Sequence, residues 1–218
     1  MNATELWERP VSYAAVGATQ ADDLLAYPPP GYRAIERRAR IGHGEARFAY
    51  AWASALSWGI QRNSGFHVHL VDTPVEVSGP SYTPVSFDAA GVPVPPEIAT
   101  HAEQTFGPDG SPFLAPGDTA LLGVPFGPFR INAPARVVYV VDEPRRKGFA
   151  YGTIAGHPED GEEAFLVEIW DDGSVWIVIR AFSRPASRLW WCVSPVLRFM
   201  QERYTRRYGR ALAGPISE

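Results

Sequence analysis

The spacing of apolar residues changes several times along the chain. Between residues 44 and 58 apolar positions recur every three or four residues and alanines supply helix propensity, so we expect an amphipathic helix there. Segment 32–41 has two isoleucines among several arginines, which indicates a first or edge strand, and 66–71 is predicted to be a short strand. The first third of the chain is therefore expected to run strand, helix, strand.

After residue 118 the pattern is that of a sheet, because short β-rich runs follow one another with turn residues between them. The expected strands are 119–124, 129–133, 135–142, 148–155, 163–170 and 174–182.

The clearest turn is Asp172-Gly173, which predicts a type I′ hairpin between the last two strands. In the register that this turn sets, Phe165 lies opposite Arg180, and Glu163 lies diagonally across from Arg180 on the same face. Both faces of the hairpin are largely apolar, so we expect both to be covered, by helices, by an insertion or by a second subunit.

The last part of the chain returns to helical spacing. Ser194 is a suitable N-cap before Pro195, and an apolar stripe continues down to Gly214. The stripe consists of Leu197, Met200, Tyr204, Tyr208 and Leu212. This order of elements predicts an α+β helix-grip fold (START/Bet v 1-like), in which a curved antiparallel sheet wraps a long C-terminal helix.

Residues 72–118 interrupt this order of elements. They hold 9 of the 21 prolines within 47 residues, which excludes a central strand. Pro96, followed by Ile98, Ala102 and Phe106, predicts one short helix inside the segment. We expect a single domain over 1–218 that carries 72–118 as a Pro-rich insertion or lid.

Composition and charge exclude several classes of function. A net charge of −4 and a pI near 5.8 give no general attraction to nucleic acid. The single cysteine, Cys192, excludes an internal disulfide and a Cys-rich zinc site, and it points to a reducing compartment. The longest apolar runs, 48–60 and 189–200, are shorter than a membrane span, and the first ten residues lack the apolar stretch of a signal peptide. We therefore expect a cytoplasmic protein without a membrane span.

Several runs of residues are similar to a known family. They are 16–19, 31–33, 40–48, 136–165, 181–185 and 206–208. Together they resemble the uncharacterised DUF1990 (UPF0548-like) family of bacterial and plant proteins over nearly the whole chain, although the Pro-rich insertion looks longer than the family's usual connection. The resemblance implies a helix-grip (SRPBCC-like) fold. It implies no activity, substrate or catalytic residue, because none is established for the family.

A charged pair in apolar surroundings is the strongest candidate for a site. Burying Glu163 and Arg180 costs several kcal/mol unless the two are tightly hydrogen-bonded or serve a task. We expect them to line a cavity between sheet and final helix, where they would orient the head group of a hydrophobic or amphipathic small molecule; a structural ion pair is the alternative. The expected ligand-binding residues are Glu163, Arg180, Tyr151, His157, Phe165, Trp176, Phe182 and Arg184.

Two other classes of function stay open. An enzyme of the cyclase, dehydratase or hydrolase type would use Glu163 or His157 as general base and Arg180 or Arg184 as oxyanion partner, although no nucleophile stands out. A protein-interaction module would use the arginine-rich side of the C-terminal helix, and the separation of acidic and basic segments is compatible with a homodimer.

No metal or cofactor is expected. The stretch 156–163 holds one histidine and four carboxylates, but a loop broken by glycine and proline does not make ligands converge. We expect an acidic turn in which His157 bonds to the backbone. Gly42-His43-Gly44 lacks the lysine and the further glycines of a phosphate-binding loop.

Overall fold

The computed structural model describes residues 3–71, 86–87, 93–94, 106–107, 110, 112–187 and 207–214. Seven strands form one antiparallel sheet in the order β1-β9-β8-β7-β6-β5-β2. They are β1 (Arg33–His43), β2 (His67–Val71), β5 (Thr119–Phe126), β6 (Phe129–Glu143), β7 (Arg146–Thr153), β8 (Glu159–Ile169) and β9 (Ser174–Pro185). Two short strands, β3 (Ser86–Phe87) and β4 (Pro93–Val94), pair separately within the predicted insertion.

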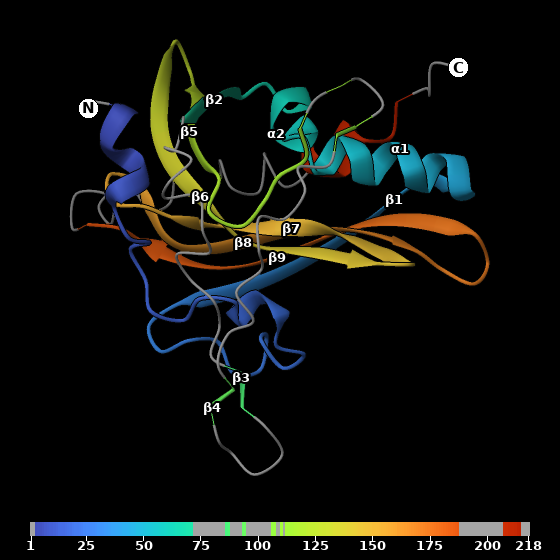
Figure 1. Cartoon of the computed structure of the whole chain (residues 1–218), viewed down its shortest axis with the longest axis horizontal. Coiled ribbons are helices and arrows are strands. Elements are labelled where there is room, and N and C mark those ends of the chain that lie inside the picture. Colours follow the sequence, from blue (N-terminus) through green and yellow to red (C-terminus); the bar gives the residue numbers. More distant parts are fainter. Residues whose placement is uncertain are drawn as a thin grey trace.

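The two α-helices that follow β1 lie on one face of the sheet (Figure 1). They are α1 (Glu45–Ala55) and α2 (Gly59–Asn63), so the helix predicted over 44–58 is confirmed but ends three residues early. The chain bends between them because Trp58 has a left-handed φ of 60°. A Cβ on Gly59 would lie 2.5 Å from the Ser54 carbonyl oxygen, so only glycine fits this close turn. The strands predicted at 32–41 and 66–71 are confirmed as β1 and β2.

All the strands predicted after residue 118 are present; most are longer than predicted, whereas the one predicted at 148–155 is shifted to 146–153. Two of them, 129–133 and 135–142, form the single strand β6, which runs through Pro134. Proline has no N–H to donate, but the Pro134 carbonyl oxygen still accepts the Ile154 amide at 3.1 Å. Pairing with β5 on one side and β7 on the other therefore continues past the proline.

The turn between β8 and β9 is not the type I′ turn that was predicted. Its loop has three residues, 171–173, and of these only Gly173 has a positive φ, of 76°. The Asp172 carboxylate accepts the Ser174 amide (2.9 Å) and hydroxyl (2.6 Å), and the Trp170 amide bonds the Ser174 carbonyl at 2.9 Å. These bonds favour a three-residue loop with glycine in the left-handed position.

The extra loop residue shifts the β8–β9 register by one position. Glu163 pairs with Ala181, and Ala164 pairs with Arg180. Because side chains alternate between the faces of a strand, a shift of one residue moves every β9 side chain to the other face. Glu163 and Arg180 therefore lie on opposite faces of the sheet, and their predicted pairing is wrong.

Both faces of the sheet are covered, as the apolar hairpin predicted. The helix side holds the main core, with Trp58, Phe149 and Phe165 fully buried. The other side is covered by residues 11–32, here called the N-terminal segment, which include η2 (Ala18–Gln20) (Figure 1). Tyr13 and Leu24 of this segment pack on Phe182.

Several sequence predictions fall mainly outside the described residues. Of the final helix, predicted from Ser194 to Gly214, the structure describes 207–214: residues 207–211 are helical, and Tyr208 and Leu212 are buried in the main core. The short helix predicted from Pro96 lies outside the described residues apart from Phe106. Within the described ranges, no helix has the length and apolar character needed to cross a membrane.

Candidate functional site

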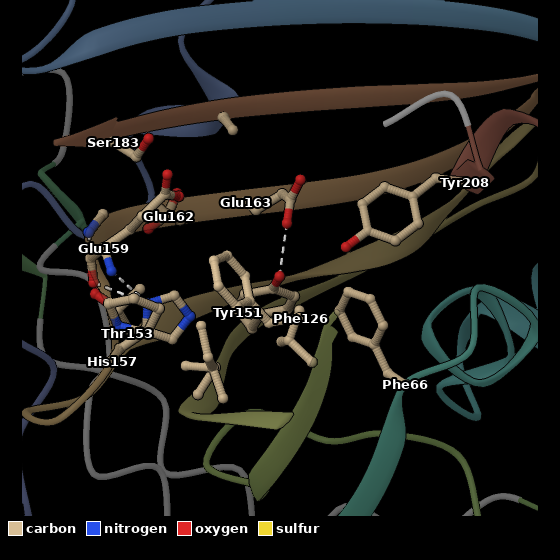
Figure 2. A pocket seen from close by; sticks show the side chains of 16 residues that line it. Phe66, Phe126, Tyr151, Thr153, His157, Glu159, Glu162, Glu163, Ser183 and Tyr208 are labelled. Atoms are coloured by element: carbon tan, nitrogen blue, oxygen red, sulfur yellow. Dashed lines mark hydrogen bonds between the residues drawn. The ribbon is translucent and has the colours of Figure 1, made fainter. Parts of the chain in front are cut away.

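A cavity of about 120 Å³ lies on the helix side of the sheet (Figure 2). It is bounded by strands β5 to β9, by the residue before β2 and by the described end of the final helix. Its apolar lining consists of Phe66, Val124, Phe126, Ile131, Ala133, Pro158 and Ala181. Its polar side chains are Tyr151, Thr153, His157, Glu159, Glu163, Ser183 and Tyr208. Gly161 and Glu162 also border it, but the Glu162 carboxylate is bonded to the N-terminal part of the chain on the opposite face of the sheet.

Strand β8 supplies the two carboxyl groups of the cavity. The structure begins this strand at Glu159, four residues earlier than predicted. The alternation of a strand then puts Glu159 and Glu163 on the cavity side and Asp160 and Glu162 on the opposite side. The predicted acidic turn is thus the start of a strand that divides four carboxyl groups equally between two faces.

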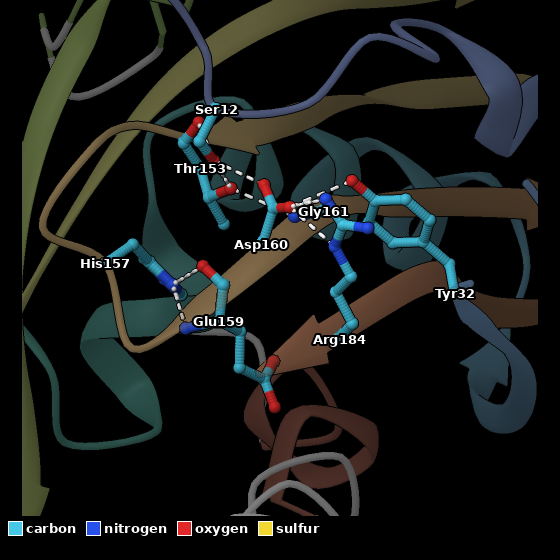
Figure 3. A network of polar contacts seen from close by, with 8 residues as sticks. All are labelled: Ser12, Tyr32, Thr153, His157, Glu159, Asp160, Gly161 and Arg184. Carbon is cyan, nitrogen blue, oxygen red and sulfur yellow. Dashed lines mark hydrogen bonds and ion pairs between the residues drawn. The ribbon is translucent and has the colours of Figure 1, made fainter. Parts of the chain in front are cut away.

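Gly161, between the two cavity carboxyls, allows β8 and β9 to approach closely. A Cβ at this position would lie 2.0 Å from the Phe182 carbonyl oxygen, a distance that no side chain tolerates. The Gly161 amide also donates to the Thr153 hydroxyl at 3.0 Å, which ties β8 to β7 at the same point (Figure 3). The glycine therefore fixes the spacing of the strand end that carries both carboxyls.

Glu163 accepts a hydrogen bond from the Tyr151 hydroxyl at 2.6 Å (Figure 2). Burial raises the pKa of the Glu163 carboxyl to about 7, although this hydrogen bond opposes the rise. Burial and the neighbouring carboxyl keep the pKa of Tyr151 well above its ordinary value of 10.0, so the phenol stays protonated and donates. Among the described residues, no lysine or arginine forms a salt bridge with Glu163.

Glu159 is the second carboxyl of the cavity. Burial, and then the nearby Glu163, raise its pKa to about 7, while a hydrogen bond from the Ser183 side chain opposes the rise. No described lysine or arginine makes a salt bridge with Glu159 either. The cavity thus holds two carboxyl groups with pKa values near 7 beside an apolar wall.

His157 bonds to the backbone, as predicted from the sequence. Its Nδ1 lies 3.0 Å from the Glu159 amide, which donates to it, and 2.9 Å from the Glu159 carbonyl oxygen. Burial lowers the pKa of His157 to about 4, so the ring is neutral at pH 7. It borders the cavity without contributing a positive charge.

The other predicted site residues lie elsewhere. Phe165 is in the core just behind the cavity, stacked on Tyr151 with ring centroids 5.8 Å apart. Arg180 lies on the opposite face, where it forms an ion pair with Glu36 at 3.2 Å and donates to the Ala21 carbonyl oxygen.

Three more predicted site residues share that opposite face with Arg180, because of the one-residue register shift. Phe182 packs against the N-terminal segment. Trp176 stacks on Trp170 near the end of the hairpin, with ring centroids 5.0 Å apart. Arg184 binds Asp160 through two nitrogens, each 2.9 Å from the carboxylate. Of the eight residues, only Glu163, Tyr151 and His157 line the cavity.

On the opposite face, Glu162 holds the N-terminal segment. Its buried carboxylate accepts bonds from the Tyr13 hydroxyl (2.7 Å), the Gly17 amide (2.7 Å) and the Thr19 amide (3.0 Å), and from the Thr19 hydroxyl. Four donors from one short segment therefore converge on a single carboxylate.

Asp160 repeats this arrangement two residues earlier (Figure 3). It accepts bonds from the Ser12 hydroxyl (2.6 Å), the Tyr32 hydroxyl (2.9 Å) and Arg184, whose guanidinium lies 4.3 Å from the centre of the Tyr32 ring. We call the contacts of Asp160 and Glu162 with residues 12–32 the N-terminal clamp. Each carboxylate oxygen of the clamp accepts at least one hydrogen bond, as in a structural network.

Several aromatic residues of the cavity were not predicted from the sequence, above all Phe66, Phe126 and Tyr208. Each comes from a different part of the chain, and only the three-dimensional pairing of β2 with β5 brings the first two together. A strand predicted to begin at Glu159 would have put Asp160 and Glu162 on one face and Glu159 and Glu163 on the other, so the alternation of side chains was the available signal. No group of three described His, Cys, Asp or Glu side chains is arranged to hold a metal ion.

The fold and the site define an α+β protein in which an antiparallel sheet, covered by helices on one face, encloses a small cavity with two carboxyl groups. The chain belongs to the DUF1990 family, described as a domain of unknown function, because residues 12–95 and 98–211 match the family's sequence profile. The resemblance identified from sequence is therefore confirmed.

Two relatives and one solved structure illustrate the similarity. A UPF0548 protein of Deinococcus radiodurans is 33% identical over 205 residues, which cover 94% of this chain and 87% of that one. A UPF0548 protein of Arabidopsis thaliana is 36% identical over 89 residues, covering 38% of this chain and 43% of that protein. The crystal structure of a hypothetical protein from Helicobacter pylori matches with a TM-score of 0.50 and 10% identity, covering 94% of this chain and 97% of that one, which is a likeness of fold alone.

Proposed function

We propose that this protein has a helix-grip fold and binds a small molecule with an apolar body in the cavity beside Glu163. The observation that carries the proposal is the lining itself. One wall is aliphatic and aromatic, while a few polar groups converge from β7 and β8, which is the usual composition of a small-molecule site. A volume of about 120 Å³ is close to the ~150 Å³ of an engineered cavity that binds benzene, so the natural ligand inserts a ring or a short chain.

The energetics of the two carboxyls support a functional role. An acid whose pKa is raised to about 7 by burial destabilises the folded state at neutral pH. Glutamine at either position would keep the shape and avoid this cost. Groups that cost stability and face a cavity are candidates for function, because the fold alone gives no reason to keep them.

Filling the cavity tests the proposal. Ala181 lines it and is buried, so Ala181→Leu should place three carbon atoms in the ligand space. We expect the affinity for benzyl alcohol, measured by NMR titration of the protein, to fall at least tenfold. The free energy of unfolding should change by no more than about 2 kcal/mol, because the new atoms enter existing space.

The matched control is Ala26→Leu, the same substitution at an exposed position in the N-terminal segment. It should leave the affinity for benzyl alcohol unchanged. If the parent does not bind benzyl alcohol at millimolar concentration, or if both variants bind it equally well, the cavity is not the binding site.

A second candidate function, acid–base catalysis, is favoured by one observation. Glu163 has a pKa of about 7 and lies 2.6 Å from a phenol, which suits proton transfer at neutral pH. The predicted oxyanion partners Arg180 and Arg184, however, lie on the other face of the sheet. Binding is therefore the better supported function. Catalysis would be recognised by turnover that Glu163→Gln abolishes while binding persists.

A further inference from the structure

We infer that the head group of the ligand is a cation, and that a protonated amine seated at Glu163, with Glu159 on the same wall of the cavity, fits it best. The inference rests on the proposed function and specifies its ligand class.

The charge balance of the cavity is the first argument. Two carboxyls face it, and no lysine or arginine is among the described residues that line it. Among the described lining residues, His157 is the one with an ionisable nitrogen; its ring is neutral at pH 7, and its Nδ1 accepts the Glu159 amide. At pH 8 both acids are ionised, so an anionic head group would meet two negative charges with no counter-charge among the described lining residues, and a neutral one would leave them uncompensated. A cation supplies the charge that each acid lacks.

The hydrogen-bonding capacity of the cavity points the same way. The Glu163 carboxyl uses one acceptor site for Tyr151, and the Glu159 carboxyl uses one for Ser183. A carboxylate offers about four acceptor sites, so several stay available on the pair, and an ammonium group brings three donors. Charge-assisted bonds of this type are the strong ones.

The aromatic rings supply the third argument. Phe66, Phe126, Tyr151 and Tyr208 all border the cavity, and in Figure 2 the Tyr208 hydroxyl points toward the Glu163–Tyr151 pair. Ring faces attract a cation, and more strongly where water is excluded. The cavity therefore combines an apolar wall for a hydrocarbon body with an acidic, aromatic end for a positive head.

The test compares three probes of nearly equal shape at pH 8: benzylamine, benzyl alcohol and benzoate. Isothermal titration calorimetry with the full chain should show benzylamine binding at least tenfold more tightly than benzyl alcohol, and benzoate binding most weakly. Glu163→Gln should bring the affinity for benzylamine to within about threefold of the affinity for benzyl alcohol, both measured on that variant. Glu143→Gln removes an exposed carboxyl elsewhere on the sheet and should change neither affinity.

The possible outcomes distinguish failure of the amine inference from failure of the proposed binding function. If benzylamine and benzyl alcohol bind the parent equally and both are lost in Ala181→Leu, the cavity binds ligands but has no preference for cations, and the inference is wrong. If none of the probes binds the parent, the proposed function fails and the inference fails with it. Binding of benzylamine that is equally tight in Glu163→Gln would also overturn the inference, because the amine would then sit elsewhere.

Discussion

Replacing Glu162 by alanine is expected to lower the free energy of unfolding by about 4 kcal/mol, the largest effect that we predict for a single polar side chain. The substitution leaves the Tyr13 hydroxyl, the Gly17 amide and both Thr19 donors without their acceptor at a buried position. The loss should be concentrated in the N-terminal segment. Urea denaturation gives the total change, and hydrogen exchange should show faster exchange over residues 12–24 than over β8.

Glu168→Ala is the matched control for this prediction. Glu168 lies on the same strand and the same face, but its side chain is only partly buried and makes a 3.7 Å ion pair with Arg146. Glu168 also accepts a hydrogen bond from the Trp170 indole at 3.2 Å. Partly exposed contacts of this kind contribute little, so we expect a loss of about 1 kcal/mol, well below that of Glu162→Ala. Equal losses in the two variants, or unchanged exchange over residues 12–24, would show that the N-terminal clamp does not hold the segment in place.

Replacing Glu163 by glutamine should have the opposite effect on stability at pH 8, raising the free energy of unfolding by up to about 3 kcal/mol. The folded-state pKa of about 7 lies above the ordinary value of 4.5, and each pKa unit corresponds to ~1.4 kcal/mol. The native carboxyl keeps its proton up to about pH 7, whereas the unfolded chain releases it near pH 4.5. The parent therefore loses stability as the pH rises from 4.5 to 7, and glutamine does not titrate.

The difference between Glu163→Gln and the parent should thus be close to zero at pH 4.5 and reach its full value at pH 8. His157, whose pKa is lowered to about 4, is present in both chains and cancels in the difference. Glu159 adds to the gain, because the variant lacks the Glu163 charge that helps to raise the pKa of Glu159. Urea denaturation at both pH values measures this, with Glu143→Gln as the control that removes an exposed carboxyl and relieves no burial. A constant difference across this range would mean that Glu163 titrates as an exposed acid does. If the amine inference also holds, the same variant gains stability and loses affinity.

Most of the fold follows from local patterns in the sequence. The helix at 44–58 and the strands after 118 have apolar residues at the correct period, so burial and local preference agree. The Asp172-Gly173 turn was located correctly, but its type was not, because the Asp172 side chain bonds Ser174 and adds a third loop residue. A dipeptide preference does not include that side-chain bond.

The site was harder to predict than the fold because it depends on register. Glu163, Tyr151 and His157 were identified as residues of one cavity, and they line it. The partner assigned to Glu163 was wrong, since one loop residue sent Arg180 to Glu36 on the other face. Phe66 and Tyr208 reach the cavity from segments far apart in the chain, and the sequence holds no local signal for such a meeting.

The division of four acids along the start of β8 also limits how this protein can evolve. A substitution at one of these four acids changes only the face of the sheet on which that side chain lies. A single residue added between Asp160 and Glu162 would instead move every later side chain of β8 to the opposite face. Glu162 would then face the cavity and Glu163 would face the N-terminal clamp, so the clamp and the cavity would both be lost. Changes of length in relatives should therefore collect in connections such as 72–118 and be purged from 159–163.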